Sequence, residues 1–433
     1  MLRTIDLRGR ALSAAELLAA VPRARSARAG ALTAAAAIVD DVAARGEEAL
    51  REQAAQFDRV QGHAIRVPEE QLDGALDRLH PDVRAALEEA IRRVRTASAA
   101  QVPPPARTEL TAGGAVTQRW QPVRRAGVYV PGGKAVYPSS VVMNVVPAQI
   151  AGVQQVALAS PPQAAFDGQV HPDILAAAKL LGVTEVYAMG GAGAIGAFAH
   201  GVASLGLDPV DVVSGPGNNF VAAAKRAVAG LVGVDAEAGA TEILIVADAA
   251  SDPVLVAVDL ISQAEHDEQA SAVLVTDSEQ LADRVGAEVA ARVDATRNGA
   301  RAAQALAGVQ SAVVLVDDMA AAAAFSNAYA PEHLELQQAD PQTDDFVNAG
   351  AVFVGPFSPV SLGDYLAGSN HVLPTGGQAR YAAGLSAATF LRPQQVIEYD
   401  RDALHEVAGH IVTLADTEAL PAHGEAVTAR FTG

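Results

Sequence analysis

The sequence predicts an α/β fold with two Rossmann-like parallel-sheet domains, a helical N-terminal region and a C-terminal dimerisation tail. Three observations lead to this prediction: residues 1 to about 107 carry helical spacing, eight β-branched runs follow, and amphipathic stretches separate most of these runs. Runs that are apolar on both faces and are joined by helices are typical of parallel sheets covered on each side.

The elements can be assigned in chain order. The helical region ends at VPPPAR (102–107), because proline lacks an amide donor and restricts the residue before it. Four runs follow, AGVYV, QVALAS, EVYAMG and DVVSG, and then four more, EILIVAD, SAVLVTD, SAVVLVD and AVFVG. We expect an N-terminal tail (1–24), a discontinuous first domain (25–128 plus 243–385), a second domain (129–242) and a C-terminal tail (386–433). The last part is more polar, contains the helical DALHEVAGHIVTLAD, and is of a kind that often packs on another subunit.

Composition excludes several functions. The chain has 433 residues, half of them apolar, and its 31 basic and 50 acidic residues give a net charge of −19, so we expect a globular protein that binds no nucleic acid. It has no cysteine, which excludes disulfides and a thiolate nucleophile and leaves only nitrogen and oxygen donors for zinc. The N-terminus lacks a signal-peptide core, and no span of about 20 apolar residues occurs, so the prediction is a cytoplasmic protein without membrane contact.

Four separated motifs carry residue types suited to metal binding or proton transfer: Gln263 and His266 in SQAEH, Glu332 and His333 in APEHLEL, Asp364 and His371 in GDYLAGSNH, and His423 in LPAHGEAV. The first pair lies three residues apart on a predicted crossover helix that begins near Asp252, so both side chains share a face and can converge on one ion. The alternative is that His266 only interacts with the helix C-terminus and Gln263 is a surface residue.

The pair Glu332 and His333 follows a proline and precedes an extended segment. A backbone bend there can direct two successive side chains into one cavity, which a regular strand forbids; an ordinary solvated pair is the alternative. The segment 358–377 surrounds Asp364 and His371 with turn-forming residues, as in loops that carry function. The remaining histidines are interpreted as surface or satisfied core residues: His63, His80, His171, His200, His405 and His410.

Three glycine-rich turns are candidates for binding a phosphate or nucleotide. Segments 127–140 and 213–226 each run from a strand through Pro and Gly to a helix start, which exposes backbone N–H groups. The third, 190–201, contains Gly191-x-Gly193-x-x-Gly196 and matches the dinucleotide fingerprint. That match alone is weak, because neither Asp208 nor Asp211 lies at the end of a following strand.

Together, DLISQAEHD, APEHLEL, SPVSLGDYLAGSNHVLPT and LPAHGEAV resemble the histidinol dehydrogenase family, a likeness that runs from RTIDLRG to PAHGEAV. The resemblance implies a zinc- and NAD-dependent homodimer that oxidises L-histidinol, with part of each active site supplied by the partner subunit. It implies Glu332 and His333 as the acid/base pair, and Tyr129, Gly193 and Asn218 at the positions that contact NAD. The implied zinc ligands are Gln263, His266, Asp364 and His423. These four would also contact the substrate, together with Thr241, His333, His371 and Glu418.

Two positions depart from the family pattern. Gly193 replaces a glutamine expected to reach NAD, and Ala240 replaces a proline in AGATE. Because a lost hydrogen bond typically costs about 0.5–1.5 kcal/mol, we expect weaker NAD binding, and we expect Gly193→Gln to lower the apparent KM for NAD.

The residue types also suit the reaction. An imidazole with a pKa near neutrality can take the hydroxyl proton while hydride leaves, which makes His333 the candidate base. A carboxylate such as Glu332 can activate water for the second oxidation, and zinc can anchor the imidazole and amine of the substrate. The alternatives are an NAD-dependent dehydrogenase of another small alcohol, a zinc hydrolase, which would turn over without NAD, and an inactive binding protein.

Overall fold

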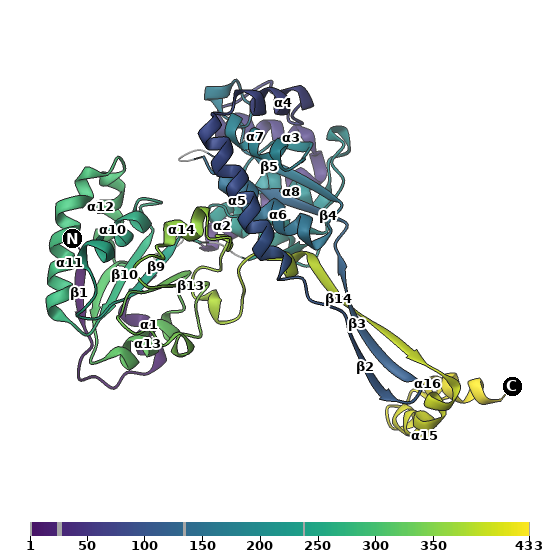
Figure 1. The fold of residues 1–433 in the computed structure, drawn as a ribbon. Helices are drawn as coiled ribbons and strands as arrows, with labels where there is room; N and C mark the ends of the chain where they lie inside the picture. The colour runs from purple at the N-terminus through teal and green to yellow at the C-terminus, as the bar shows by residue number, and fades with distance from the viewer. Residues whose placement is uncertain (1, 24–27, 133–135, 237–238, 433) are drawn as a thin grey trace. The chain divides into compact units, whose positions relative to one another are not determined.

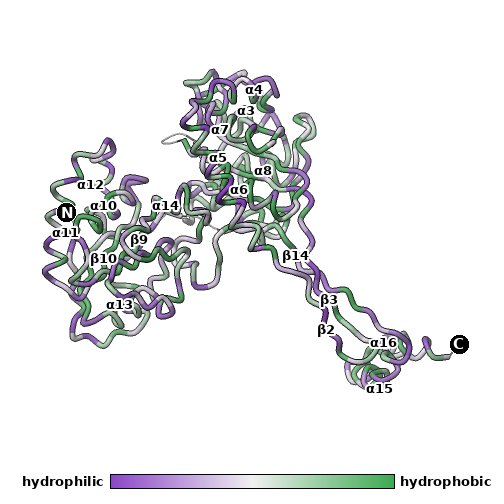
Figure 2. The backbone as a smooth tube through the Cα atoms, viewed as in Figure 1, coloured by the Kyte–Doolittle hydropathy of each residue, from purple (hydrophilic) through white to green (hydrophobic). Residues whose placement is uncertain are grey.

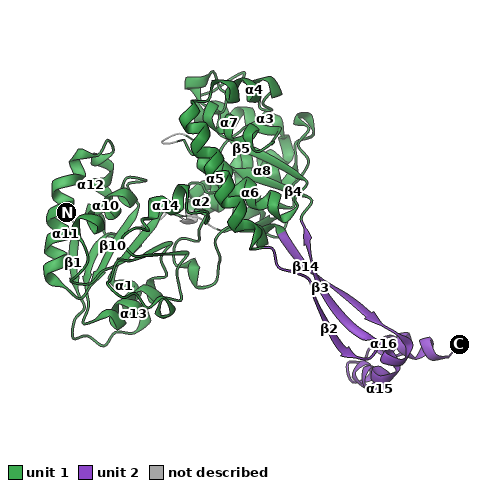
Figure 3. Cartoon of the chain, viewed as in Figure 1, with its two compact units in different colours: residues 1–101, 123–390 green, residues 102–122, 391–433 purple. Residues whose placement is uncertain are grey.

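The computed structural model describes residues 2–23, 28–132, 136–236 and 239–432. Its contacts divide the chain into unit 1, residues 1–101 and 123–390, and unit 2, residues 102–122 and 391–433 (Figure 3). Within the described residues, no helix combines the length and apolar character needed to cross a membrane.

Unit 1 contains a six-stranded, fully parallel sheet with the order β1-β11-β10-β9-β12-β13 (Figure 1). Its central strands are apolar and fully buried, and Figure 2 shows their hydrophobic character along β9 and β10. Buried side chains pack on both faces of this sheet, as expected for strands covered by helices on each side. The strands are β1 (Arg3–Asp6), β9 (Glu242–Val246), β10 (Ser271–Thr276), β11 (Ala312–Leu315), β12 (His333–Leu336) and β13 (Ala351–Val354).

A second sheet of unit 1 has five parallel strands in the order β6-β5-β4-β7-β8. The strands are β4 (Arg125–Tyr129), β5 (Gln155–Ser160), β6 (Glu185–Ala188), β7 (Val212–Ser214) and β8 (Gly233–Val234). All eight predicted runs form strands in these two sheets, which confirms the α/β class with two parallel sheets.

Apart from the edge strand β1, both sheets begin with a middle strand, and the direction in which later strands are added then reverses. In the six-stranded sheet the chain moves from β9 outward to β10 and β11 and then returns to β12 on the other side of β9. In the five-stranded sheet it moves from β4 to β5 and β6 and then returns to β7. Such reversals leave a crevice between the diverging connections, where α/β proteins commonly bind ligands.

The N-terminal segments differ from the predicted grouping in where they pack. β1 pairs with β11, so part of the expected N-terminal tail (1–24) is an edge strand of the six-stranded sheet. Residues 25–128 were grouped with 243–385, yet α2 contacts α8 and α9, α4 contacts α7, and α5 contacts α6, all of which flank the five-stranded sheet. The physical reason is burial, because the apolar faces of these helices complete the core of that sheet.

The helices of unit 1 are α1 (Ala14–Ala20), α2 (Arg28–Arg45), α3 (Glu47–Gln53), α4 (Glu69–Arg78), α5 (Pro81–Ala99), α6 (Pro138–Ala151), α7 (Pro172–Leu180), α8 (Gly191–His200), α9 (Asn219–Val228), α10 (Pro253–Ala264), α11 (Glu279–Arg292), α12 (Gly299–Ala307), α13 (Met319–Tyr329) and α14 (Val360–Tyr365). The turn VPPPAR lies outside them, as predicted, because α5 ends at Ala99.

Unit 2 is a small antiparallel sheet joined to two helices. β3 (Gly114–Pro122) lies between β2 (Ala106–Thr111) and β14 (Leu391–Tyr399), and its register with β14 runs from Leu391 opposite Pro122 to Tyr399 opposite Gly114. α15 (Arg401–Thr417) and α16 (Pro421–Thr428) follow. The helical DALHEVAGHIVTLAD was predicted, whereas the three strands were not.

Candidate functional site

A cluster of buried polar side chains lies at the amino ends of β9 and β12. Thr241 directly precedes β9, and His333 is the first residue of β12. α10 connects two parallel strands, so its C-terminal end returns to the same edge and carries Gln263 there. Three segments that are distant in sequence therefore meet at the amino edge of the six-stranded sheet, next to β9 and β12.

The Thr241 hydroxyl links the members of this cluster. It donates to Glu332 Oε2 at 2.6 Å and accepts from Gln263 Nε2, also at 2.6 Å. The backbone N–H of Glu242 donates to the same Glu332 oxygen at 2.8 Å. These bonds fix the Gln263 amide so that its Oε1 atom remains buried without a hydrogen-bond partner among the described residues.

The bend predicted before β12 is present. Ala330 adopts a left-handed conformation with φ of 50°, and the next residues bring Glu332 to the N–H and His333 to the carbonyl oxygen of the same residue of β9, Glu242. His333 Nδ1 lies 3.1 Å from the carbonyl oxygen of Glu242 and 3.5 Å from Glu332 Oε2. Because a carbonyl only accepts, Nδ1 carries the proton in neutral His333, and Nε2 is left as an acceptor. The solvated-pair alternative does not hold, because Glu332 is 6% and His333 4% exposed.

Burial sets the protonation of this pair. It raises the pKa of Glu332 to about 7, although the bonds from Thr241 and Glu242 oppose the shift. Burial lowers the pKa of His333, with the charge of Asp364 acting in the opposite direction. A neutral imidazole therefore lies beside a carboxyl group that exchanges its proton near pH 7, a combination suited to proton transfer.

His266, Asp364 and His371 adjoin this pair. His266 Nε2 lies 3.9 Å from Asp364 Oδ2, and both charges act on the pKa of Glu332. His371 Nδ1 donates to the Asp364 carbonyl oxygen at 2.9 Å, and its Nε2 then accepts from the Ser140 hydroxyl at 3.0 Å. Both ring nitrogens of His371 are therefore used within the protein. Ser140, on α6, was not predicted, because no local pattern connects it to residue 371.

The polar cluster contains some of the donor atoms that a zinc site needs. Among the described residues, no three His, Cys, Asp or Glu side chains are gathered closely enough to hold a metal ion. The cluster does contain a buried, unpartnered amide oxygen on Gln263 and a neighbouring imidazole and carboxylate on His266 and Asp364. These nitrogen and oxygen donors fit zinc, with a further ligand required. The fourth predicted ligand, His423, and the predicted contact Glu418 are exposed residues of unit 2.

Glu242 is a further buried charge that sequence reasoning missed. Its Oε1 atom accepts from Arg23 Nε at 2.6 Å, and the Arg23 guanidinium lies 4.2 Å from the ring centre of Tyr329. Burial nevertheless raises the pKa of Glu242 to about 7. The ion pair with Arg23 fixes the side chain of Glu242, the residue whose backbone N–H and carbonyl contact Glu332 and His333.

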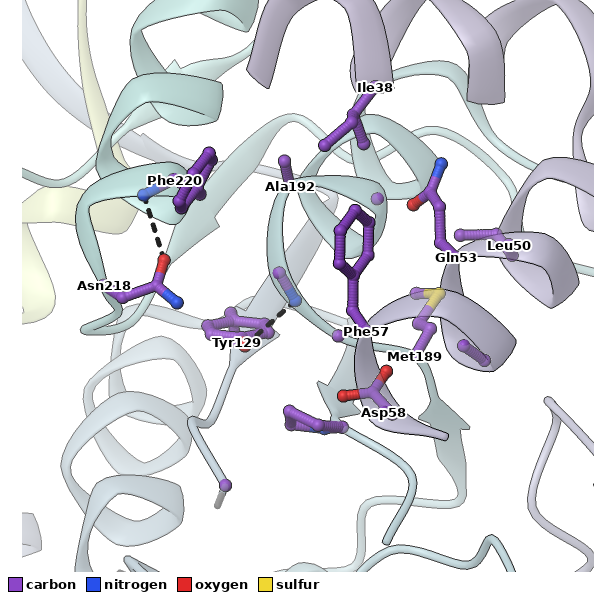
Figure 4. Close-up of a pocket in the computed structure, with 16 residues that line it drawn as sticks. Ile38, Leu50, Gln53, Phe57, Asp58, Tyr129, Met189, Ala192, Asn218 and Phe220 are labelled. Carbon is purple, nitrogen blue, oxygen red and sulfur yellow. Dashed lines mark hydrogen bonds between the residues drawn. The ribbon is translucent and has the colours of Figure 1, made fainter. Parts of the chain in front are cut away.

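A second feature is a pocket of about 340 Å³ at the carboxyl ends of the five-stranded sheet (Figure 4). It lies at that sheet's reversal point, since Tyr129 ends β4 and Asn218 follows β7. The exposed aromatic rings of Phe57 and Phe220 also line it, as does Asp58, whose pKa burial raises to about 6. Its size, aromatic walls and position suit part of a nucleotide.

The predicted residues of this pocket form its inner wall. The Tyr129 hydroxyl accepts from the Gly191 N–H at 3.1 Å and so fixes the start of α8. Asn218 caps α9 by accepting from the N–H groups of Phe220 at 2.9 Å and Val221 at 3.2 Å. Gly193 lines the pocket as well, so all three residues expected to contact NAD lie together.

The glycine motif itself has a different role from a fingerprint turn. Gly191, Gly193 and Gly196 lie within α8, and a Cβ on Gly196 would be 3.1 Å from the Cα of Val39 in α2. That glycine permits close helix packing. The space that a side chain at 193 would need is occupied by the end of the flexible Gln53 side chain. The prediction that Gly193→Gln lowers the apparent KM for NAD therefore also requires the Gln53 amide to move aside.

A buried imidazole and carboxyl pair on one parallel sheet, together with a pocket on another that suits part of a nucleotide, is an arrangement typical of dinucleotide-dependent oxidoreductases. The family model described as histidinol dehydrogenase matches residues 21–431. The chain belongs to the histidinol dehydrogenase family. It is 62% identical over 432 residues to histidinol dehydrogenase of Leifsonia xyli subsp. xyli, covering 99% of both chains. It is 56% identical to that of Mycobacterium bovis, covering 100% of this chain and 98% of the relative.

A solved structure agrees with this assignment. The crystal structure of histidinol dehydrogenase from Elizabethkingia anophelis superposes with a TM-score of 0.93 at 31% identity and covers 99% of this chain and 98% of that one. The activity is accordingly that of a histidinol dehydrogenase in histidine biosynthesis, and the family uses Zn²⁺ and NAD⁺.

Proposed function

We propose that the polar cluster at β9 and β12 oxidises L-histidinol to L-histidine through L-histidinaldehyde, with NAD bound in the pocket of the five-stranded sheet. One observation supports this most directly: His333 donates from Nδ1 to the Glu242 carbonyl, which leaves Nε2 as an acceptor on a ring whose Nδ1 lies 3.5 Å from Glu332 Oε2. The fixed orientation prepares this imidazole to take a proton from a substrate hydroxyl.

Each oxidation removes a hydride from the carbon and a proton from the oxygen. In the first, His333 takes the hydroxyl proton, and hydride transfer to bound NAD would give the aldehyde. Water then adds to the aldehyde: Glu332 accepts the water proton, and protonated His333 returns its proton to the carbonyl oxygen, which gives the hydrate. Neutral His333 then takes a hydroxyl proton of the hydrate, and hydride transfer to a second NAD would leave the carboxylic acid. Two NAD are consumed per histidinol.

The ligands we propose for zinc are Gln263, His266, Asp364 and His423. Bound zinc would supply a fixed cationic anchor for the imidazole and amine of the substrate. The unpartnered Oε1 of Gln263 supports this assignment, because a buried amide oxygen without a donor otherwise carries a desolvation cost. Thr241 orients that amide, and we propose His371 and Glu418 as further substrate contacts.

The test is NADH formation by purified protein with L-histidinol and excess NAD, before and after metal removal. We expect two NADH per histidinol, loss of activity on stripping and its return with zinc. Activity with another small alcohol but not histidinol would contradict the substrate, and substrate turnover without NAD would instead indicate a hydrolase.

We also propose a homodimer in which His423 and Glu418 complete the site of the partner subunit. Mixing inactive His333→Ala and His423→Ala proteins under conditions that allow subunit exchange should then restore activity, because a mixed dimer carries one intact site. A mixture of His333→Ala with Glu332→Ala is the matched control and should stay inactive. Absence of recovery in exchanged His333→Ala and His423→Ala dimers would contradict the shared site.

A further inference from the structure

The wall of the pocket near Gly193 contains an amide that the proposed reaction does not use. Gln53 is the last residue of α3 and continues into a π-helical turn, Ala54–Asp58, that also carries the pocket residues Phe57 and Asp58. Figure 4 shows the Gln53 side chain beside Leu50 on this wall. The Gln53 amide therefore reaches the pocket from an N-terminal helix, far in sequence from the glycine-rich turns.

The two ends of the Gln53 amide have different surroundings. Oε1 lies in the space directly in front of the Gly193 Cα, where any Cβ would collide with it. Nε2 is buried and has no hydrogen-bond partner among the described residues. A buried N–H donor without an acceptor is unfavourable, and native proteins retain such groups mainly where a ligand or ordered water satisfies them.

Positions 53 and 193 also exclude each other. A side chain at 193 would have to displace the end of Gln53, and Leu50 Cδ2, 3.3 Å from the same point, limits the remaining space. The Gln53 amide thus keeps its position because residue 193 is a glycine and has no side chain.

We propose that Gln53 is a cofactor-positioning residue whose Nε2 donates a hydrogen bond to bound NAD, and that Gly193 is required to make room for it. The proposal rests on the proposed function, which places NAD in this pocket. NAD offers acceptors throughout its length, in its ring nitrogens, ribose hydroxyls and carboxamide oxygen. The chain therefore supplies an amide to the cofactor from α3.

The first test compares Gln53→Met, which keeps the volume and removes the donor, with Gln56→Ala, an exposed glutamine on the same π-helical turn. NAD is titrated into the purified protein, and the Kd is measured together with KM for NAD and for histidinol. We expect Gln53→Met to raise the Kd and KM for NAD about fivefold, as for one neutral hydrogen bond. Gln56→Ala should leave the Kd and KM for NAD unchanged. Neither variant should change KM for histidinol. An unchanged Kd in Gln53→Met would overturn the proposal.

The second test uses the competition between the Gln53 amide and a side chain at position 193 for the same space. Gly193→Ala should raise the Kd for NAD about as much as Gln53→Met, because the new methyl group displaces the amide, and the double variant should be no weaker than either single variant. Gly193→Gln should bind NAD nearly as well as the unmodified chain, since it displaces one amide and supplies another. Additive losses in the double variant would overturn the link between the two positions.

The unfolding temperature distinguishes a cofactor-positioning role of Gln53 from a purely structural role. Without NAD, Gln53→Met should unfold at the same temperature or higher, because it removes an unpartnered donor; a lower unfolding temperature would favour a packing role instead.

Asn218→Asp keeps the oxygen that caps α9 and adds a negative charge to the pocket. If Asn218→Asp leaves NAD binding unchanged, the pocket assignment itself fails; if it weakens binding while Gln53→Met does not, only the inference about Gln53 fails.

Discussion

Glu335 offers a direct prediction about pH-dependent stability. It lies two residues after His333 in β12, is fully buried, and accepts from the Val360 N–H at 2.8 Å and from Gln337 Nε2 at 3.3 Å. Burial and the neighbouring Asp259 carboxylate raise its pKa to about 8, and burial raises the pKa of Asp259 to about 6. Among the described residues, neither carboxyl forms an ion pair with a cationic side chain, so the folded protein retains a proton that the unfolded chain releases.

The sign and size of the effect follow from this extra proton. A carboxyl whose pKa is raised in the folded chain keeps its proton there up to a higher pH than in the unfolded chain. The free energy of unfolding therefore falls as pH rises toward 8. Between pH 6 and 8 the folded chain holds about one proton more than the unfolded chain at this position. Two pH units at about 1.4 kcal/mol each correspond to a loss of about 2–3 kcal/mol.

The change to make is Glu335→Gln, which keeps the shape and cannot ionise. Urea unfolding followed by circular dichroism at pH 6 and pH 8, at one protein concentration, gives the free energy of unfolding. The unmodified chain should lose about 2–3 kcal/mol more than Glu335→Gln across this interval, and Glu70→Gln, an exposed control, should behave like the unmodified chain. Equal pH dependence in Glu335→Gln and the unmodified chain would refute the reasoning.

Two further predictions concern the cluster itself. Arg23→Met leaves the Glu242 carboxylate buried without its cation and should lower the free energy of unfolding by about 3–5 kcal/mol; a loss below about 1 kcal/mol in a denaturant titration would contradict this. Thr241→Val removes the hydroxyl between Gln263 and Glu332 and should reduce kcat/KM for histidinol about 10–100-fold, whereas Thr241→Ser should retain most activity; equal losses in steady-state assays of both variants would show that the hydroxyl is not responsible.

Much of the parallel-sheet architecture could be predicted from the sequence, because continuous apolar runs indicate strands buried on both faces. All eight such runs are strands, including Glu242–Val246 and Ser271–Thr276. The strands of unit 2 were missed for the opposite reason. Ala106–Thr111 is almost entirely exposed, so its side chains carry no burial pattern that a sequence could reveal. Arg3–Asp6 was missed because it is a short, charged edge strand.

The candidate site was predictable where a local motif carried it. The bend before His333 and the position of Gln263 on α10 follow from short segments, although α10 ends at Ala264 and so excludes His266, the other member of the predicted pair. The structure brings Gln263 to Glu332 through Thr241. Arg23, Ser140 and Gln53 escaped prediction because their partners lie far away in the sequence. The surroundings of Gly193 were unpredictable for the same reason, since only the fold shows that the Gln53 side chain occupies the space before it.

The position of β1 at the edge of the six-stranded sheet has a consequence for biosynthesis. Arg3 pairs with Ala312, a separation of 309 residues, so this N-terminal strand is made long before its partner. At about 5–20 residues per second, translation leaves it waiting for roughly 15–60 s. During that interval the helices of residues 28–99 and the five-stranded sheet can already assemble, since their partners emerge earlier. The six-stranded sheet is therefore completed late, because its N-terminal strand pairs with a strand that follows it by 309 residues.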